Sequence, residues 1–401
     1  MLVGRRYRLE LTCEQAEYAE QVGSICRAVW NTGLEQRREY RRRGAWINYA
    51  AQAGELVEAK REHPWLKDAP SHVLQQTLMD LDRACRERGT FRVRWRSGRG
   101  WSPSFRFPDP KQIVVERLNR RSGRVRLPKF GWVRLRWSRA LGGTIRSATV
   151  KRDGQHWYVT FLVEDGCATP GQHAHPDAVV GVDRGVAVGV ARSDGVMRDR
   201  RFRTPGEERR YRRLQQRLAR QRKRSGNRRK TNAAMRKLKR RERDRRTDFL
   251  AWTANRLTGG YALVVLEDLR TRNMTRTARG TLDQPGVHVR AKAGLNRAIL
   301  DKGWHAFELA LNSAARYTGT TIVKVPAAYT SQTCSRCRSV DPESRESQAR
   351  FRCTGCGYSE NADVNAARNI LAAGLAVTAC GDLGASRSVK QEPQLLRVGI
   401  P

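Results

Sequence analysis

The chain has 401 residues and a formal net charge of +40 at pH 7, from 79 Lys and Arg against 39 Asp and Glu. Its hydrophobic content of 39%, with ten tryptophans, excludes a disordered basic tail and allows two or three folded domains. A chain this basic repels itself unless a polyanion neutralises it, so nucleic acid is the expected partner, and no run approaches the ~20 apolar residues that a membrane span needs.

The first ninety residues are predicted to form one strand followed by three helices. Apolar and polar side chains alternate over residues 3–11, as in a half-buried strand. Thr12 and Gln15 have the spacing of a capping box, which predicts that a helix starts there. Helical spacing predicts two more helices, around 47–62 and 71–87. Between the first two lies an arginine run, interpreted mainly as a solvated face: Arg37, Arg38, Arg41, Arg42 and Arg43.

From about residue 91 to 165 apolar residues recur with a period of two, which predicts strands. They are expected to form a small antiparallel barrel with one basic face. The strand at 3–11 joins this barrel, so the first helices form an insertion. Residues 165–178 are rich in turn-forming residues and are interpreted as a linker. The predicted strands are 91–96, 124–128, 132–137 and 157–163, with turns at 120–124 and 152–155.

The second half of the chain is predicted to form a mixed sheet with a hairpin and a crossover. An apolar strand ends at Asp183, and a second strand begins near Val186. Residues 261–267 form a continuous apolar run, which is typical of a buried parallel strand. The remaining predicted elements are a turn at 193–195, a helix around 295–317, a strand at 320–325 and a helix capped by Asn361.

Residues 207–247 form the most basic stretch of the chain. They are predicted to form a helical hairpin with little core of its own, broken at Ser225, Gly226 and Asn227. A solvated hairpin is one interpretation. Contact with phosphates is preferred, because so dense a cationic surface is costly without counter-charge.

Four of the nine cysteines form two C-x2-C pairs that are separated by fifteen residues. Four thiolates at this spacing suit one structural, tetrahedral zinc ion in a ribbon: Cys334, Cys337, Cys353 and Cys356. Two disulfides, or four unrelated cysteines, are the alternatives. The other five cysteines are scattered, and no signal-peptide pattern opens the chain. This usage favours a reducing cytoplasm over a disulfide framework.

Three carboxylates stand in apolar or small-residue contexts: Asp183, Glu267 and Asp363. Asp183 and Glu267 end predicted strands, and Asp363 opens a predicted helix. Acids kept at such positions in a basic chain are candidates for holding two catalytic magnesium ions against a phosphodiester. The alternative is that each acid only ends a strand or caps a helix, which explains one acid more readily than three.

Around these residues the sequence resembles the TnpB proteins of bacterial insertion sequences and the compact type V CRISPR nucleases. The likeness extends from YRLELT at 7–12 to a tail motif at 378–393. Each motif alone is weak, but their combination is specific. The motifs at the candidate sites are VVGVDRGV, VVLEDLRTRNMT, AYTSQTCSRC, FRCTGCGY and NADVNAARNI. Arg338 departs from the family pattern, because glycine is commoner after the second cysteine; it is expected to alter a turn and not the metal site.

The resemblance implies a multidomain α+β protein with an RNase H-like (RuvC) nuclease domain. It also implies a zinc-ribbon insertion and a small wedge β-barrel that carries an inserted helical recognition domain. The implied segments are 1–11 and 91–170 for the wedge barrel, 12–90 for the recognition domain, 171–328 and 359–378 for the nuclease, 329–358 for the zinc ribbon, and 379–401 for a flexible C-terminal tail.

The function implied by the resemblance is RNA-guided, magnesium-dependent cleavage of DNA. Asp183, Glu267 and Asp363 match the three catalytic acids of the family. The implied partners are a guide RNA, which reads the target sequence, and double-stranded target DNA with a short flanking motif. The oligomeric state stays open, with a monomer as one option. The tail motif favours the insertion-sequence family over a CRISPR effector that uses a CRISPR RNA.

Other functions are weighed against this one. A guided DNA-binding repressor with little cleavage would have lost a carboxylate, and none is lost. A transposase is suggested only by His173 and His175, which lie in a linker. A basic RNA-binding protein of the ribosomal kind leaves the acids unexplained. Four tryptophans are candidates for stacking on bases, although tryptophan is more often a core residue: Trp30, Trp46, Trp95 and Trp101.

Overall fold

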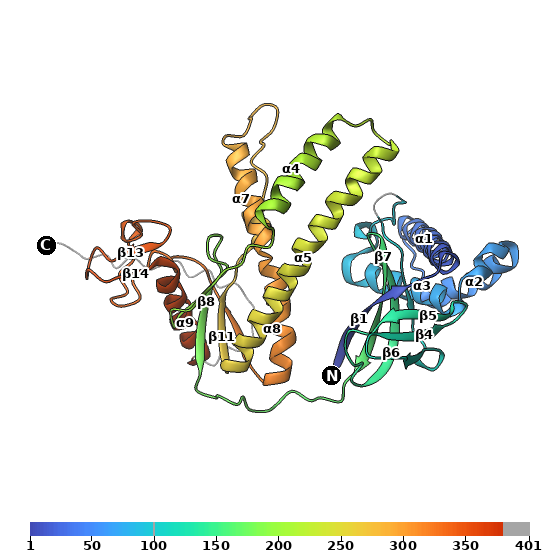
Figure 1. The fold of residues 1–401 in the computed structure, drawn as a ribbon, viewed down its shortest axis with the longest axis horizontal. Helices are drawn as coiled ribbons and strands as arrows, with labels where there is room; N and C mark the ends of the chain where they lie inside the picture. Colours follow the sequence, from blue (N-terminus) through green and yellow to red (C-terminus); the bar gives the residue numbers. More distant parts are fainter. Residues whose placement is uncertain (99–100, 380–401) are drawn as a thin grey trace. The chain divides into compact units, whose positions relative to one another are not determined.

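The computed structural model describes residues 1–98 and 101–379 (Figure 1). The chain divides into two units, residues 1–167 and the residues from Ala168 onward. Residues 380–401, with most of the predicted flexible tail and its family motif, lie outside the described residues. Within the two described ranges, no helix is both long enough and apolar enough to cross a membrane.

The first unit contains an antiparallel sheet of seven strands, in the order β2-β6-β7-β1-β5-β4-β3. The N-terminal strand β1 (Leu2–Glu10) lies in the middle, between β7 (His156–Glu164) and β5 (Gly131–Arg136). The predicted joining of the N-terminal strand to the later strands is therefore confirmed. The other strands are β2 (Ser104–Phe107), β3 (Val114–Arg117), β4 (Ser122–Leu127) and β6 (Thr144–Asp153). Of these, β2, β3 and β6 were not predicted.

The predicted strand at 91–96 is wrong. A short 3-10 helix, η2 (Thr90–Arg92), begins this segment, and the rest lies extended along α1 (Cys13–Arg42). Side chains of α1 satisfy its carbonyl groups, because Asn31 Nδ2 donates to Arg96 O at 3.2 Å and Arg38 Nη2 donates to Val93 O at 2.9 Å. Among the described residues the segment has no strand partner, and of its alternating apolar residues only Val93 is buried, whereas Phe91 and Trp95 are exposed.

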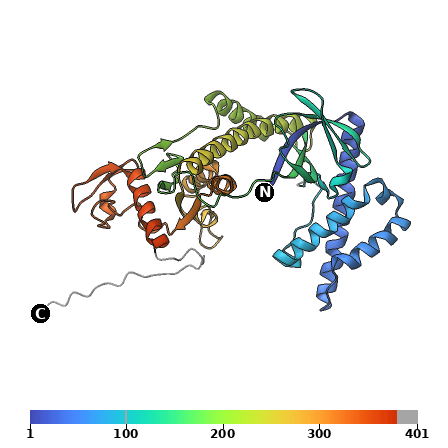
Figure 2. The same ribbon diagram turned by 90° about the horizontal axis from the view of Figure 1, so that it is seen from below.

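Three helices accompany the sheet: α1, α2 (Tyr49–Glu62) and α3 (Ser71–Arg88) (Figure 2). The predicted capping box is present, since the Thr12 side chain accepts from Gln15 N and the Gln15 side chain accepts from Thr12 N. The arginine run lies largely inside α1, and Arg37 is only 2% exposed. Its guanidinium pairs with Asp82 of α3 at 2.8 Å, so the solvated interpretation is wrong for this residue. Two 3-10 helices, η1 (Pro64–Asp68) and η3 (Pro110–Gln112), complete the unit's elements.

The second unit contains a mixed sheet in the order β10-β9-β8-β11-β12. Strands β8, β11 and β12 are parallel, whereas β9 pairs antiparallel with β8 and with β10. The predicted mixed sheet is confirmed, but its second strand begins at Val190 and not near Val186. Before it, residues 184–189 are irregular or bent; the Arg184 side chain is buried, and a Cβ atom at Gly185 would lie only 2.8 Å from Val188 O. The strands are β8 (Val179–Asp183), β9 (Val190–Arg192), β10 (Met197–Arg198), β11 (Leu263–Glu267) and β12 (Thr321–Val325).

Helices cover both faces of this sheet. Apolar residues of α5 and α8 pack on one face, together with Val264 and Leu266 of β11. The opposite face takes α9, because Ile370 packs with Val265 and Val323. The basic hairpin is formed by α4 and the long α5, and Ser225 caps α5 as expected at the predicted break (Figure 1). The helices are α4 (Pro205–Arg220), α5 (Gly226–Gly260), α6 (Thr271–Met274), α7 (Val289–Lys302), α8 (Trp304–Thr318) and α9 (Ala362–Ala379).

The predicted single helix around 295–317 is wrong. Gly303, in the left-handed conformation with φ of +73°, separates α7 from α8. A left-handed residue cannot continue an α-helix, and glycine adopts this conformation without strain. Between β12 and α9 lies a segment with the 3-10 helix η4 (Pro342–Ser344) and a two-stranded sheet of β13 (Arg350–Arg352) and β14 (Ser359–Asn361). We call residues 329–358 the ribbon.

Gly181 allows β8 and α9 to pack closely. A Cβ atom at this position would lie 2.1 Å from Ala367 O and 2.7 Å from Leu371 N. Gly181→Ala is therefore expected to lower the free energy of unfolding by about 1–3 kcal/mol or more, as overpacking does. Gly294→Ala is the matched control, because no heavy atom lies within 4 Å of its Cβ position inside α7. Thermal unfolding of Gly181→Ala at the wild-type temperature would contradict this packing.

Candidate active site and metal centre

The structure places the three predicted carboxylates near the carboxyl ends of two inner strands of the mixed sheet. Asp183 and Glu267 are the last residues of the neighbouring parallel strands β8 and β11, which are in register at Val182 and Leu266. Asp363 is the second residue of α9, where Asn361 Oδ1 accepts from Asp363 N at 2.9 Å and caps the helix as predicted. Glu267 and Asp363 both act electrostatically on Asp183, and α9 packs against β8 and β11, so the three acids lie in one region of the unit.

The surroundings of these three carboxyl groups disfavour their charged forms. Burial, and then repulsion from Glu267 and Asp363, raises the pKa of Asp183 to about 7. Burial also raises the pKa values of Glu267 and Asp363 above their ordinary range. A bound cation would supply counter-charge to three acids that are each disfavoured in the charged form.

A network from separate elements holds Glu267. Thr330 Oγ1 donates to Glu267 Oε1 at 2.5 Å, and Asn369 of α9 donates to Thr330 O at 3.0 Å. The Arg184 side chain is fully buried, donates to Glu267 O and pairs with Glu308 of α8 at 2.5 Å. The ends of β8 and β11 are thereby fixed to each other. Neither Thr330 nor Arg184 was predicted, although Arg184 directly follows Asp183.

Arg345 of the ribbon is the cation that faces Asp363. Its Nη2 atom lies 3.7 Å from Asp363 Oδ1, which is too long for a hydrogen bond. Its charge lowers the pKa values of both Asp363 and Asp183, in opposition to burial. The guanidinium therefore keeps donors that no carboxylate of this site uses. Sequence reasoning missed Arg345, which lies between the two cysteine pairs.

The four predicted zinc ligands also come together. Among the described residues, their thiols are the one group of three or more candidate metal ligands whose ligand atoms all lie within 4.8 Å of one another. The Sγ atoms of Cys334 and Cys356 are 3.8 Å apart, and those of Cys337 and Cys353 are 3.5 Å apart. Four sulfur atoms at such separations suit tetrahedral zinc.

Each cysteine pair is followed by a left-handed residue. Arg338 has a φ of +66° and Gly357, at the corresponding place, has a φ of +68°. Arg338 N donates to Cys334 O at 3.0 Å, and Gly357 N donates to Cys353 O at 3.0 Å. The expected alteration of the turn by Arg338 is therefore wrong, because the arginine adopts the conformation of a glycine. Its side chain is held by Asn369 Oδ1 at 3.3 Å.

The ribbon is attached to the helix that carries Asp363. Asn365 of α9 accepts from Ser335 N at 2.9 Å and donates to Thr333 O at 2.8 Å. Asn369 donates to Thr333 O at 2.6 Å as well as to Thr330 O. The cysteine cluster and the carboxylates are therefore linked through one turn of α9.

His173 and His175 do not form a second site. His173 is buried, its Nδ1 atom accepts from His175 N at 2.9 Å, and its Nε2 atom lies 2.8 Å from Thr258 O. Both ring nitrogens are thus occupied by backbone groups. His173 therefore joins the linker to α5, and neither of its ring nitrogens is left for a metal or for a transposase reaction.

Basic and aromatic surfaces occur in both units. None of the described residues of α4 is buried, and acids pair with arginines only at the base of the hairpin, as Glu242 does with Arg203 at 2.5 Å. In the first unit the Arg96 guanidinium lies 3.8 Å from the Trp30 ring centre. Trp46 and Trp95 remain exposed beside Arg41 and Arg38, respectively, whereas Trp30 and Trp101 are partly buried.

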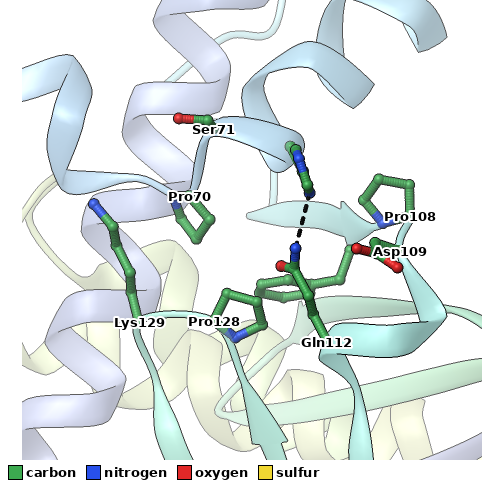
Figure 3. Close-up of a pocket in the computed structure, with 9 residues that line it drawn as sticks. Pro70, Ser71, Pro108, Asp109, Gln112, Pro128 and Lys129 are labelled. Atoms are coloured by element: carbon green, nitrogen blue, oxygen red, sulfur yellow. Dashed lines mark hydrogen bonds between the residues drawn. The ribbon is translucent and has the colours of Figure 1, made fainter.

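A cavity of about 230 Å³ lies in the first unit, between the start of α3, η3 and the β4–β5 turn. Figure 3 shows its proline-rich wall and the hydrogen bond between Gln112 and the His72 ring, at 3.3 Å. Lys129 and Asp109 also line it. The three carboxylates belong to the other unit, so this cavity is separate from their site.

Three family models match the amino-acid sequence. The model described as "Probable transposase" matches residues 161–278, and "Helix-turn-helix domain" matches residues 1–45, which here form β1 and the single helix α1. The model described as "Cas12f1-like, TNB domain" matches residues 304–370.

Two relatives match over nearly their whole length. The chain is 40% identical over 390 residues to the Escherichia coli K12 protein named "Putative RNA-guided DNA endonuclease InsQ", covering 95% of this chain and 94% of the relative. It is 31% identical over 427 residues to a Streptomyces pristinaespiralis protein named "Putative RNA-guided DNA endonuclease", covering 99% and 97%.

A solved structure of a nucleic-acid complex shares the fold. The match to "Cryo-EM structure of the Cas12f1-sgRNA-target DNA complex" has a TM-score of 0.58 and 13% sequence identity, and it covers 90% of this chain and 83% of that one. At this identity the likeness concerns the fold alone.

Proposed function

The chain belongs to the TnpB family of insertion-sequence RNA-guided nucleases, and we propose that it is an RNA-guided DNA endonuclease that hydrolyses phosphodiesters with two magnesium ions. The observation that carries this proposal is the common site of Asp183, Glu267 and Asp363 with their raised pKa values. Such a site gains from divalent cations, and nuclease chemistry uses them.

In this proposal Asp183, Glu267 and Asp363 hold the two ions. Three carboxylates from separate elements suit a pair of ions. Bound there, the ions would activate water and stabilise the leaving oxygen of the phosphodiester. Thr330 orients the Glu267 carboxylate, and Arg184 keeps the ends of β8 and β11 at a fixed separation. Arg345 is placed to attract the phosphate, because its donors are not satisfied by Asp363.

The other surfaces divide the work of binding. Guide pairing reads the target sequence, while the basic protein surface holds the nucleic acid by its backbone. We assign contact with the displaced strand to the α4–α5 hairpin. Readout of the flanking motif belongs to the first unit, where Gln112 and His72 offer groups that can bind base edges. The cysteine cluster holds one structural zinc ion, which keeps the ribbon folded. The ribbon itself is the target-binding element.

Within this proposal the residues keep their expected domain roles. Residues 1–11 and 91–170 form the wedge, and 12–90 form the recognition domain. Residues 171–328 and 359–378 form the RuvC-like nuclease domain. Its sheet order, with one antiparallel hairpin and parallel neighbours, supports an RNase H-like assignment.

Sequencing the RNA that co-purifies with the full chain tests the guided role. A discrete RNA derived from a transposon end is the expected result. A repeat-derived RNA would instead assign the chain to a CRISPR system. The absence of any discrete RNA species would contradict guidance by RNA.

Magnesium binding is expected to depend on pH. The folded-state pKa of Asp183 is raised, so without magnesium the folded state binds more protons than the unfolded state between about pH 4 and pH 7. The stability of the magnesium-free protein therefore falls as pH rises through that window. Magnesium binds the deprotonated acids, so its increase of the thermal unfolding temperature should grow from about pH 5.5 to pH 8. An increase that is equal at both ends of this range would contradict the site.

A further inference from the structure

Tyr329 combines a strained backbone with an exposed ring. Its φ is +63°, in the left-handed region that bulky side chains rarely adopt. The residue is nevertheless 59% exposed and belongs to none of the hydrophobic clusters. The described residues provide no hydrogen bond to its hydroxyl group. Folding therefore accepts backbone strain here without packing the ring, which is the pattern of a residue kept for binding.

The neighbouring contacts hold this conformation firmly. The carbonyl oxygen of Tyr329 accepts from the backbone N of Gln332 and of Thr333, each at 3.0 Å, and from Thr333 Oγ1 at 2.8 Å. The next residue is Thr330, whose hydroxyl donates to Glu267 and whose carbonyl accepts from Asn369. The ring of Tyr329 is thus presented from a rigid turn that directly adjoins the carboxylate site.

We propose that the Tyr329 ring is a stacking platform for an unpaired base of the DNA strand that enters the nuclease site. This inference rests on the proposed function. A guided nuclease meets every base sequence at its cut position, so contacts there have to be sequence-tolerant. Stacking on an aromatic ring meets this requirement, because every base has a π-face. Arg345 holds the strand by its phosphate, while Tyr329 holds a neighbouring base and so fixes the scissile bond against Asp183, Glu267 and Asp363.

The chain offers variants that separate the ring from the backbone. Tyr329→Gly and Tyr329→Asn remove the ring, and both residues tolerate the left-handed conformation. Glycine removes strain but adds freedom to the unfolded chain, so the unfolding temperature should change little. Tyr329→Phe keeps the ring and removes only the hydroxyl group. If the Tyr329 ring had no binding role, its replacement by glycine would leave the activity unchanged.

The test uses the full chain with its guide RNA and a guide-matched DNA duplex. Tyr329→Gly and Tyr329→Asn are expected to lower kcat/KM for cleavage on the order of tenfold or more, whereas Tyr329→Phe should stay within about threefold of wild type. A second measurement places 2-aminopurine at successive positions around the cut, in an Asp183→Ala background that leaves the strand intact. The fluorescence should be quenched at one position with Tyr329 or Phe and recover with Gly.

Two outcomes separate this inference from the proposed function. If wild type cleaves the matched duplex and the Gly and Asn variants cleave it equally well, the stacking role is wrong and the nuclease function stands. If wild type does not cleave the matched duplex at all, the proposed function fails and the stacking role fails with it. Fluorescence that is quenched equally in the Gly variant would also overturn the stacking role.

Discussion

Asp183→Ala is expected to abolish guide-directed cleavage while binding of the guide and the matched duplex persists. Burial, and then electrostatic repulsion from Glu267 and Asp363, raises the pKa of Asp183 to about 7. Removing it takes away a ligand of the proposed magnesium ions and the several kcal/mol of transition-state stabilisation that they supply. We expect the cleavage rate to fall at least about a thousandfold. Single-turnover cleavage and a gel-shift titration measure the two properties separately.

The same variant should not be less stable than wild type. The charged form of Asp183 is disfavoured in the folded state, so its removal relieves repulsion from Glu267 and Asp363. Asp177→Ala is the matched control, because it removes an exposed acid just before β8 and should cleave like wild type. Cleavage by Asp183→Ala at a rate near that of wild type would show that the site has been wrongly assigned.

Cys334→Ser is expected to release zinc and to reduce cleavage strongly. Cys334 is fully buried, and its thiol lies with the other three in the cysteine cluster. Structural zinc sites contribute apparent binding energies of about 10–16 kcal/mol to folding, so the ribbon should unfold without the metal. The ribbon carries Arg345 and Thr330, and it is fixed to α9 through Asn365 and Asn369. Loss of zinc is therefore expected to displace the residues that support the carboxylate site.

The zinc content of the purified protein is measured by inductively coupled plasma mass spectrometry. Wild type should contain one zinc ion per chain, and Cys334→Ser should contain much less. Cys13→Ser is the control, since Cys13 is an exposed cysteine at the start of α1 in the other unit. An unchanged zinc content in Cys334→Ser would rule out the four-cysteine site.

Several elements were predicted correctly where a periodic pattern is bounded by a residue that commonly starts or ends a helix or strand. The capping box at Thr12 and the Ser225 cap mark true helix starts, and the apolar run before Glu267 is a buried parallel strand. The strand at 91–96 failed because side chains of α1, about sixty residues earlier in the chain, bind its backbone carbonyl groups in place of a neighbouring strand. The helix around 295–317 failed because Gly303, a residue type that commonly ends helices, adopts the left-handed conformation and separates α7 from α8.

The site was predictable in its ligands but not in their supports. Carboxylates at strand ends and paired cysteines carry their chemistry in residue type and spacing. Thr330 and Arg184 hold Glu267 from 63 and 83 residues away, and each is an ordinary residue in its own segment. The strain at Tyr329 likewise exists only in three dimensions, because nothing in the surrounding residue types demands a left-handed tyrosine.

Guide-directed cleavage of DNA in the presence and absence of magnesium tests the central claim most directly. The measurement uses the purified complex with its co-purified RNA and an end-labelled duplex that matches the guide segment of that RNA. We predict cleavage of the matched duplex in magnesium, no cleavage of a mismatched duplex, and no cleavage in EDTA. Equal cleavage of both duplexes, or cleavage that persists in EDTA, would contradict an RNA-guided, magnesium-dependent nuclease.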